Sequence, residues 1–321
     1  MGRETQMRGS RPKTAGQLGE FRRKMESIAR RAAEACNELE SVSDHDALSR
    51  LIDRIGEYET PILRAAIEKT ESILKCDRYV DEEVVSDREY PPTFKGPKPL
   101  EEQIKILADI FKLSSGPALE YAKKLPEQPT EARAEGWYAI PALHALINKY
   151  WPGKSLAAGY CLATNMVLQK LGETRPFFNN REGQVAEKHF RREKYSKEKL
   201  LNLAEKQRGN NILIVAAQFG KRHRGRSVLR ALESFSPYEY GLGAFEVGCM
   251  ALTHPERFSC EEEVDADCCG DEVALKVGDD YRSAPCFIYR ANKLQFDVLL
   301  AGGSGTTFGH CGAVSGFMPE D

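Results

Sequence analysis

The sequence lacks any long hydrophobic run, and this absence excludes a membrane-spanning helix. No apolar stretch approaches the roughly 18 residues that crossing a bilayer requires, and the mean hydropathy is -0.49. The N-terminus also lacks the apolar segment of a secretory signal. We therefore expect a soluble, cytoplasmic protein with no membrane partner.

Pairs of cysteines separated by two to four residues are missing as well. The nine cysteines are an odd number at irregular spacings, which favours free thiols in a reducing compartment. Structural zinc sites normally use paired cysteines a few residues apart, and the adjacent Cys268 and Cys269 are poorly placed to ligate one ion. Zinc is therefore disfavoured as a cofactor.

Charges of both signs are present, and the formal net charge is only -2. This balance conceals a segregation, because residues 181–230 hold fourteen Lys and Arg against five Glu, whereas residues 256–280 hold ten acidic side chains against two basic ones. Such blocks either attract one another inside the fold or form a site for a charged partner. The sequence leaves both interpretations open.

The hydrophobic pattern divides the chain into a helical N-terminal part and a mixed C-terminal domain. Residues 1–16 predict a disordered basic tail, and residues 17–85 predict a helical bundle whose first helix carries a heptad repeat. The same heptads also allow a dimeric coiled coil, and hence self-association or a protein partner. Four prolines between Tyr90 and Pro99 indicate a Pro-rich linker over residues 86–99.

Residues 100–321 are expected to begin with helices and to continue as an α/β domain, so the predicted fold class is α+β or mixed α/β. The apolar run at 212–217 predicts a buried strand, and residues 286–290 and 294–300 predict a hairpin turned at 291–293. Helices are predicted at 100–112, 117–125, 141–150, 155–171, 185–206, 228–235 and 244–252.

The segment AAQFGKRHRGRS, residues 216–227, is the strongest candidate for a ligand site. It leads from the predicted strand into a predicted helix, and two glycines flank its charges. Arginines on such a loop grip phosphate, and the free N–H groups of a helix N-terminus attract anions. The candidate ligand-binding residues are Lys221, Arg222, His223, Arg224, Arg226 and Ser227. The alternative is that these cations are solvated or pair with the acidic block 256–280.

The acidic block contains a candidate metal site. In an extended chain Asp265 and Asp267 project to the same face, and two carboxylates in this arrangement can hold Mg²⁺ or Mn²⁺ beside a phosphate. A solvated acidic loop is the competing interpretation. His310 and Cys311 suggest a base beside a nucleophile, but neighbouring side chains point apart in an extended chain.

These features together favour a binding protein. The sequence predicts a cytoplasmic protein whose C-terminal domain binds a phosphate-bearing ligand, with nucleic acid among the candidates, through the basic loop. One alternative is a metal-dependent enzyme that acts on a phosphorylated substrate with Asp265 and Asp267. Another is a structural or assembly protein that joins subunits through its segregated charges.

Overall fold

The structure is a computed structural model that describes residues 79–130, 133–303 and 307–318. Contacts divide the whole chain into two compact units, Met1–Cys76 and Asp77–Asp321, and all described residues belong to the second unit. This unit contains helices and two β-sheets, one antiparallel and one mixed. The C-terminal region is therefore an α+β domain.

The predicted N-terminal elements are described only in part. The basic tail predicted at 1–16 lies outside the described residues, and so does nearly all of the helical bundle predicted at 17–85. The Pro-rich segment 86–99 is described, and it packs on the C-terminal domain. Phe94 from this segment is 7% exposed and belongs to the main hydrophobic core.

The first sheet has four antiparallel strands in the order β1-β4-β10-β5. Its strands are β1 (Gly136–Pro141), β4 (Ile212–Gln218), β10 (Ser315–Phe317) and β5 (Glu239–Gly241). Strand β4 is paired on both edges and every one of its residues is buried, which explains its continuous apolar sequence. The strand predicted at 212–217 is thus confirmed.

The second sheet has the strand order β2-β9-β8-β7-β3, and β6 also pairs with β8. Its strands are β2 (Phe177–Asn179), β3 (Phe190–Arg192), β6 (Ala266–Asp267), β7 (Asp271–Val273), β8 (Ser283–Arg290) and β9 (Lys293–Leu300). Strands β2 and β9 are parallel and the other pairs are antiparallel. The predicted hairpin is confirmed as β8 and β9, and its two-residue turn places Ala291 and Asn292 at φ 52° and 58°.

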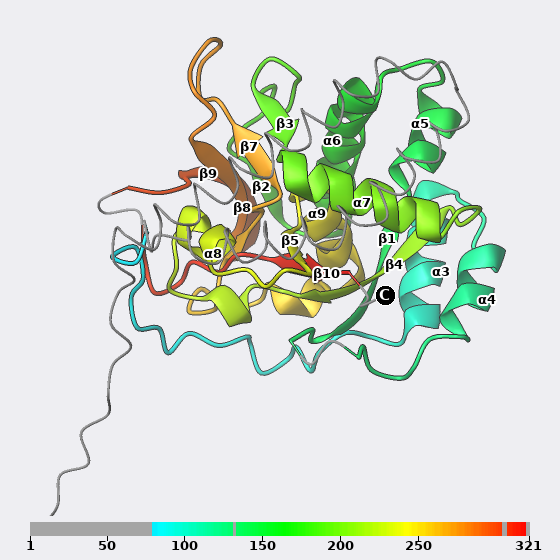
Figure 1. Cartoon of the computed structure of the whole chain (residues 1–321), viewed down its shortest axis with the longest axis horizontal. Coiled ribbons are helices and arrows are strands. Elements are labelled where there is room, and N and C mark those ends of the chain that lie inside the picture. The colour runs from blue at the N-terminus through cyan, green and yellow to red at the C-terminus, as the bar shows by residue number, and fades with distance from the viewer. Residues whose placement is uncertain (1–78, 131–132, 304–306, 319–321) are drawn as a thin grey trace, which may run out of the picture. The chain divides into compact units, whose positions relative to one another are not determined.

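Helices pack on and between the sheets. The α-helices of the described residues are α3 (Leu100–Phe111), α4 (Gly116–Ala122), α5 (Leu143–Tyr150), α6 (Leu156–Thr174), α7 (Lys194–Lys206), α8 (Val228–Glu233) and α9 (Ala244–Thr253), and the 3-10 helices are η1 (Lys221–His223) and η2 (Pro255–Arg257). Helix α9 contacts β1 of the first sheet and β8 of the second, and Figure 1 shows it between the two sheets. Within the described residues, no helix is long and apolar enough to cross a membrane.

Helices α6 and α9 approach closely because residue 248 is glycine. A Cβ atom at Gly248 would lie 2.4 Å from Val167 Cγ1 of α6, inside the van der Waals contact distance. The rings of Tyr160 from α6 and Phe245 from α9 also meet edge to face, with centroids 6.1 Å apart. This helix pair supports one wall of the pocket described below.

The helix predicted at 185–206 is wrong in its first half. Helix α7 begins only at Lys194, where the side chain of Glu193 caps it by accepting hydrogen bonds from two backbone N–H groups. The residues before it form β3, which pairs with β7. A short charged segment with one buried residue, Phe190, is compatible with a helix or a strand. Hydrogen bonding to β7 stabilises the strand here.

Three segments that are distant in the sequence run side by side. The Val84 N–H donates to Gly225 O at 2.7 Å, and the Gly225 N–H donates to Cys311 O at 2.8 Å. Asp267 forms a parallel β-bridge with Ala313. These pairings bring three segments into one region of the domain: the basic loop (residues 220–227), the acid pair Asp265 and Asp267, and residues 311–313 near the C-terminus.

Candidate functional site

The predicted basic loop follows β4, forms η1 and leads into α8. Ser227 caps α8, since its Oγ accepts the Arg230 N–H at 3.1 Å. Gly220 opens the loop with φ 114°, and a Cβ there would lie 2.8 Å from Gly312 O and 3.1 Å from Asp265 O. The predicted order of strand, loop and capped helix is therefore observed, and the loop begins beside the acid pair.

The cations of the loop are paired with carboxylates of the same domain. Glu89 forms ion pairs with both Lys221 and Arg224, and the Arg224 Nη1 to Glu89 Oε1 distance is 2.5 Å. Arg226 Nη2 lies 2.9 Å from Glu83 Oε1. Both glutamates precede α3 and lie outside the acidic block 256–280. Binding of a phosphate by this loop stays a prediction.

His223 lies in the interior of the domain. It is fully buried, and its Nε2 lies 2.6 Å from Glu239 Oε1, a carboxylate oxygen that also accepts Ser315 Oγ–H at 2.6 Å. Arg222 Nε approaches the same oxygen at 3.4 Å. Burial lowers the pKa of His223, although Glu239 opposes the shift. His223 therefore ties the loop to β5 and β10.

The acid pair lies in and just before β6, and both side chains are deeply buried. The Asp265 side chain is 9% exposed, and Asp267 is 0% exposed. Asp267 Oδ2 accepts the Gly312 N–H at 3.1 Å, while its Oδ1 has no hydrogen-bond partner in the described part of the chain. Burial raises the pKa of Asp265 to about 7, and burial together with Asp265 raises that of Asp267 to about 8.

The structure offers no fuller metal centre around this pair. In the described ranges, no group of three or more His, Cys, Asp or Glu is placed to hold a metal ion. Cys268 and Cys269 are buried, and burial raises the pKa of both thiols, which disfavours the thiolate that metals bind. A role for Asp265 and Asp267 in binding Mg²⁺ or Mn²⁺ stays a prediction.

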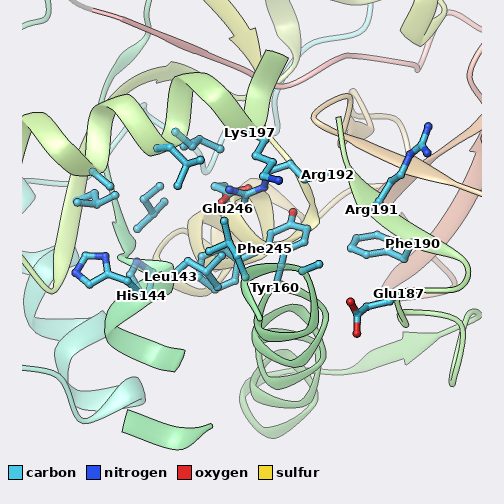
Figure 2. A pocket seen from close by; sticks show the side chains of 18 residues that line it. Leu143, His144, Tyr160, Glu187, Phe190, Arg191, Arg192, Lys197, Phe245 and Glu246 are labelled. Carbon is cyan, nitrogen blue, oxygen red and sulfur yellow. Dashed lines mark hydrogen bonds and ion pairs between the residues drawn. The ribbon is translucent and has the colours of Figure 1, made fainter. Parts of the chain in front are cut away.

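A separate pocket of about 300 Å³ lies between α7 and the N-terminal ends of α5, α6 and α9 (Figure 2). We call it the α7 pocket. Its wall is mainly apolar and includes Leu143 of α5, Leu156 of α6, Leu200 of α7, Leu213 of β4 and Phe245 of α9. A concave apolar surface with a few polar groups is the usual form of a small-molecule site.

An interior ion pair forms the polar part of the α7 pocket. Arg192 of β3 pairs with Glu246 of α9, and the Arg192 Cζ lies 3.9 Å from the centroid of the Tyr160 ring. The Tyr160 hydroxyl donates to Asp271 Oδ1 at 2.8 Å, and the Ala244 N–H donates to Asp271 Oδ2 at 2.6 Å. These contacts satisfy charges that burial would otherwise make costly.

Burial shifts the pKa values of the two carboxyls in this network, Glu246 and Asp271. Burial raises the pKa of Glu246, and it raises that of Asp271 to about 7, although Arg192 opposes both shifts. Arg192 Nε is buried and has no hydrogen-bond partner among the described residues. The network therefore consists of groups that are engaged with one another, apart from this one donor.

Two further charged side chains line the α7 pocket and have no ion-pair partner among the described residues. Lys197 of α7 and Glu187 are exposed, and neither forms an ion pair with a described residue. Arg191, in contrast, pairs with Glu272 at 2.7 Å. Figure 2 shows Lys197 on the same side of the pocket as Arg192, and Glu187 apart from them beyond Phe190.

No known protein family, curated protein or solved structure matches this chain. The function must therefore be argued from the geometry of the domain. The α7 pocket combines a cavity, an apolar wall and Lys197, a cation without an ion-pair partner among the described residues.

Sequence reasoning missed the residues of the α7 pocket. Arg192 falls within the helix predicted at 185–206, and Tyr160 and Phe245 fall within the helices predicted at 155–171 and 244–252. Glu246 carries the one signal that was available, because a lone carboxylate in the apolar segment Ala244–Leu252 needs a buried cationic partner. The sequence does not show which arginine supplies it.

Proposed function

We propose that this protein binds a small amphipathic acid in the α7 pocket. The ligand has an apolar body and one anionic group, a carboxylate or a phosphate. The observation that carries the proposal is an apolar cavity of about 300 Å³ whose wall includes Lys197, a cation without a carboxylate partner among the described residues.

The apolar body of the ligand would pack against the leucines of α5, α6 and α7 and against Phe245. Burial of this surface supplies most of the affinity, at roughly 25 cal/mol per Å². The anionic group would lie toward Lys197, on the side of the pocket where Arg192 is held. A charge-assisted contact to Lys197 would contribute on the order of 1.5–3 kcal/mol.

Binding fits this pocket better than catalysis. Glu246, which lines the pocket, and the neighbouring Asp271 are already engaged by Arg192, Tyr160 and the backbone N–H groups at the start of α9. Each of these carboxyls would have to break an existing contact before it could exchange a proton with a ligand. The network therefore supports the shape of the pocket.

The basic loop is not part of this proposal. Its cations already have carboxylate partners in Glu83 and Glu89. Its backbone donors are also used within the domain, since the Gly220 N–H donates to Gln218 Oε1 at 2.7 Å and the Gly225 N–H donates to Cys311 O at 2.8 Å. A ligand phosphate would have to displace these partners.

Isothermal titration with octanoate tests the proposal, with octanol and octylamine as neutral and cationic analogues. We expect octanoate to bind at one site per chain and to bind more tightly than either analogue. Ala204→Trp places a large side chain on the pocket side of α7 and should abolish binding. Lys197→Met should weaken octanoate binding roughly tenfold or more, because it removes the charge but keeps the side-chain length.

Lys194→Met is the matched control, because Lys194 is an exposed lysine of the same helix that does not line the pocket. It should bind octanoate like the parent protein. Circular dichroism confirms that each variant is folded. Equal binding of octanoate by the parent and by a folded Ala204→Trp variant would refute the proposal.

A further inference from the structure

A second cavity, of about 270 Å³, opens beside the acid pair. Its lining comes from Asp265, from the ends of β8 and β9, and from Phe308, His310 and Cys311 near the C-terminus. We call it the Asp265 cleft. It lies apart from the α7 pocket, because no residue lines both cavities.

Asp265 is an unpartnered carboxylate that lines this cleft. Its side chain is 9% exposed, and neither carboxylate oxygen accepts a hydrogen bond from a described residue. The imidazole of His310 lies beside this carboxyl, with Nε2 at 3.7 Å from Asp265 Oδ2. Burial, Arg290 and Arg88 lower the pKa of His310, which disfavours the imidazolium that would neutralise Asp265.

Arg290 is an unpartnered cation that lines the same cleft. It is the last residue of β8, it is exposed, and its guanidinium forms no ion pair or hydrogen bond with a described residue. Arg290 is near enough to lower the pKa of Asp265, yet the two do not form an ion pair with each other. The cleft therefore holds one carboxylate and one guanidinium apart, and both have free hydrogen-bonding capacity.

Apolar side chains fill the rest of the wall. Ile288, Leu299, Leu300 and Phe308 line the cleft, and Leu300 and Phe308 are 52% and 51% exposed. The Phe308 ring stacks on His310, with centroids 5.3 Å apart and an interplanar angle of 7°. Large apolar side chains this exposed beside buried charge are typical of a surface that a ligand covers.

We infer that the Asp265 cleft binds a small zwitterion, an α-amino acid with an apolar side chain. Its ammonium group would donate to Asp265, its carboxylate would accept from Arg290, and its side chain would cover Leu299, Leu300 and Phe308. A simple cation would leave Arg290 unpaired and would be repelled by it. A simple anion would leave the buried Asp265 carboxyl without a hydrogen-bond partner, which is costly for a polar group in the interior.

Isothermal titration with L-leucine and L-phenylalanine, at neutral to mildly alkaline pH, tests the inference. We expect at least one of them to bind. Two analogues of leucine separate the contributions, because leucinamide lacks the carboxylate and isocaproate lacks the amine. Each analogue should bind at least about tenfold more weakly than leucine, since each loses one charge-assisted contact.

Variants of the two charged residues complete the test. Asp265→Asn and Arg290→Gln should each weaken amino-acid binding at least about tenfold, whereas Arg282→Gln, a change of an exposed arginine that pairs with Asp280 at 2.7 Å outside the cleft, should have no effect. Ala204→Trp should also leave amino-acid binding unchanged, so the outcome does not depend on the α7 pocket.

The inference is overturned if neither amino acid binds, or if a folded Arg290→Gln variant binds as tightly as the parent. It is also overturned if leucinamide or isocaproate equals leucine, because the cleft would then recognise a single charge. Arg290 is exposed, so its substitution tests the inference even if Asp265→Asn does not fold.

Discussion

Replacement of Asp267 by Asn should remove a pH dependence from the stability of the domain. The Asp267 side chain is 0% exposed, and burial together with Asp265 raises its pKa from 3.8 to about 8. The folded state therefore keeps this carboxyl protonated at pH values where the unfolded chain releases the proton. The stability that this preference provides is fully present below about pH 4 and is lost as the pH rises toward 8.

The size of the effect follows from proton linkage. One proton retained only in the folded state changes the free energy of unfolding by about 1.4 kcal/mol per pH unit. Over the three units from about pH 5 to about pH 8, Asp267 accounts for a loss of up to roughly 4 kcal/mol. Asn is neutral at every pH, and its oxygen can still accept the Gly312 N–H that Asp267 Oδ2 accepts now. The variant should therefore lose less stability than the parent over this range.

Urea unfolding followed by circular dichroism at several pH values measures this difference. The control is Asp279→Asn, which is the same substitution at an exposed position. The stability curves of the control and the parent should run parallel, whereas the curve of Asp267→Asn should be flatter. If Asp267→Asn also ran parallel to the parent between about pH 5 and pH 8, the carboxyl would not be held protonated and the reasoning would be wrong.

Two further substitutions test the packing around the α7 pocket. Glu246→Gln leaves Arg192 buried without its ionised partner and should destabilise the domain by roughly 3–5 kcal/mol in urea unfolding, and an equal midpoint for variant and parent would contradict the assigned ion pair. Gly248→Ala forces a Cβ to within 2.4 Å of Val167 Cγ1 and should cost roughly 1–3 kcal/mol. Val167→Ala in the same chain should recover part of that loss, and thermal unfolding of the single and double variants measures the recovery.

Several elements could be predicted because neighbouring residues specify them. The apolar run of β4 is buried on both faces, so its sequence alone indicates an interior strand. Ser155 and Ser227 cap α6 and α8 through side-chain oxygens that accept a nearby backbone N–H, an interaction that depends only on local spacing. The β8–β9 hairpin could also be predicted, because two short apolar runs and the turn between them are close together in the sequence.

Charge pairing, in contrast, could not be predicted. The sequence suggests that the basic loop meets a ligand, is solvated or pairs with the acidic block. In the structure its cations pair with Glu83, Glu89 and Glu239, which lie outside that block. An ion pair forms between whichever charges the chain path brings together, and a net count over a block of sequence carries no information about that path.

The sequence by itself determined the secondary structure of long periodic segments, the α+β character of the C-terminal region and the residues that bear chemistry. Only the tertiary structure decided which of these residues share a cavity. Asp265, Arg290 and His310 line one cleft because β6, the end of β8 and the C-terminal segment meet there, and Arg192 meets Glu246 because β3 runs beside the start of α9. The physical reason is the sequence distance over which each interaction acts. Capping and periodicity act over a few residues, whereas a cavity forms where segments that are distant in the sequence pack together.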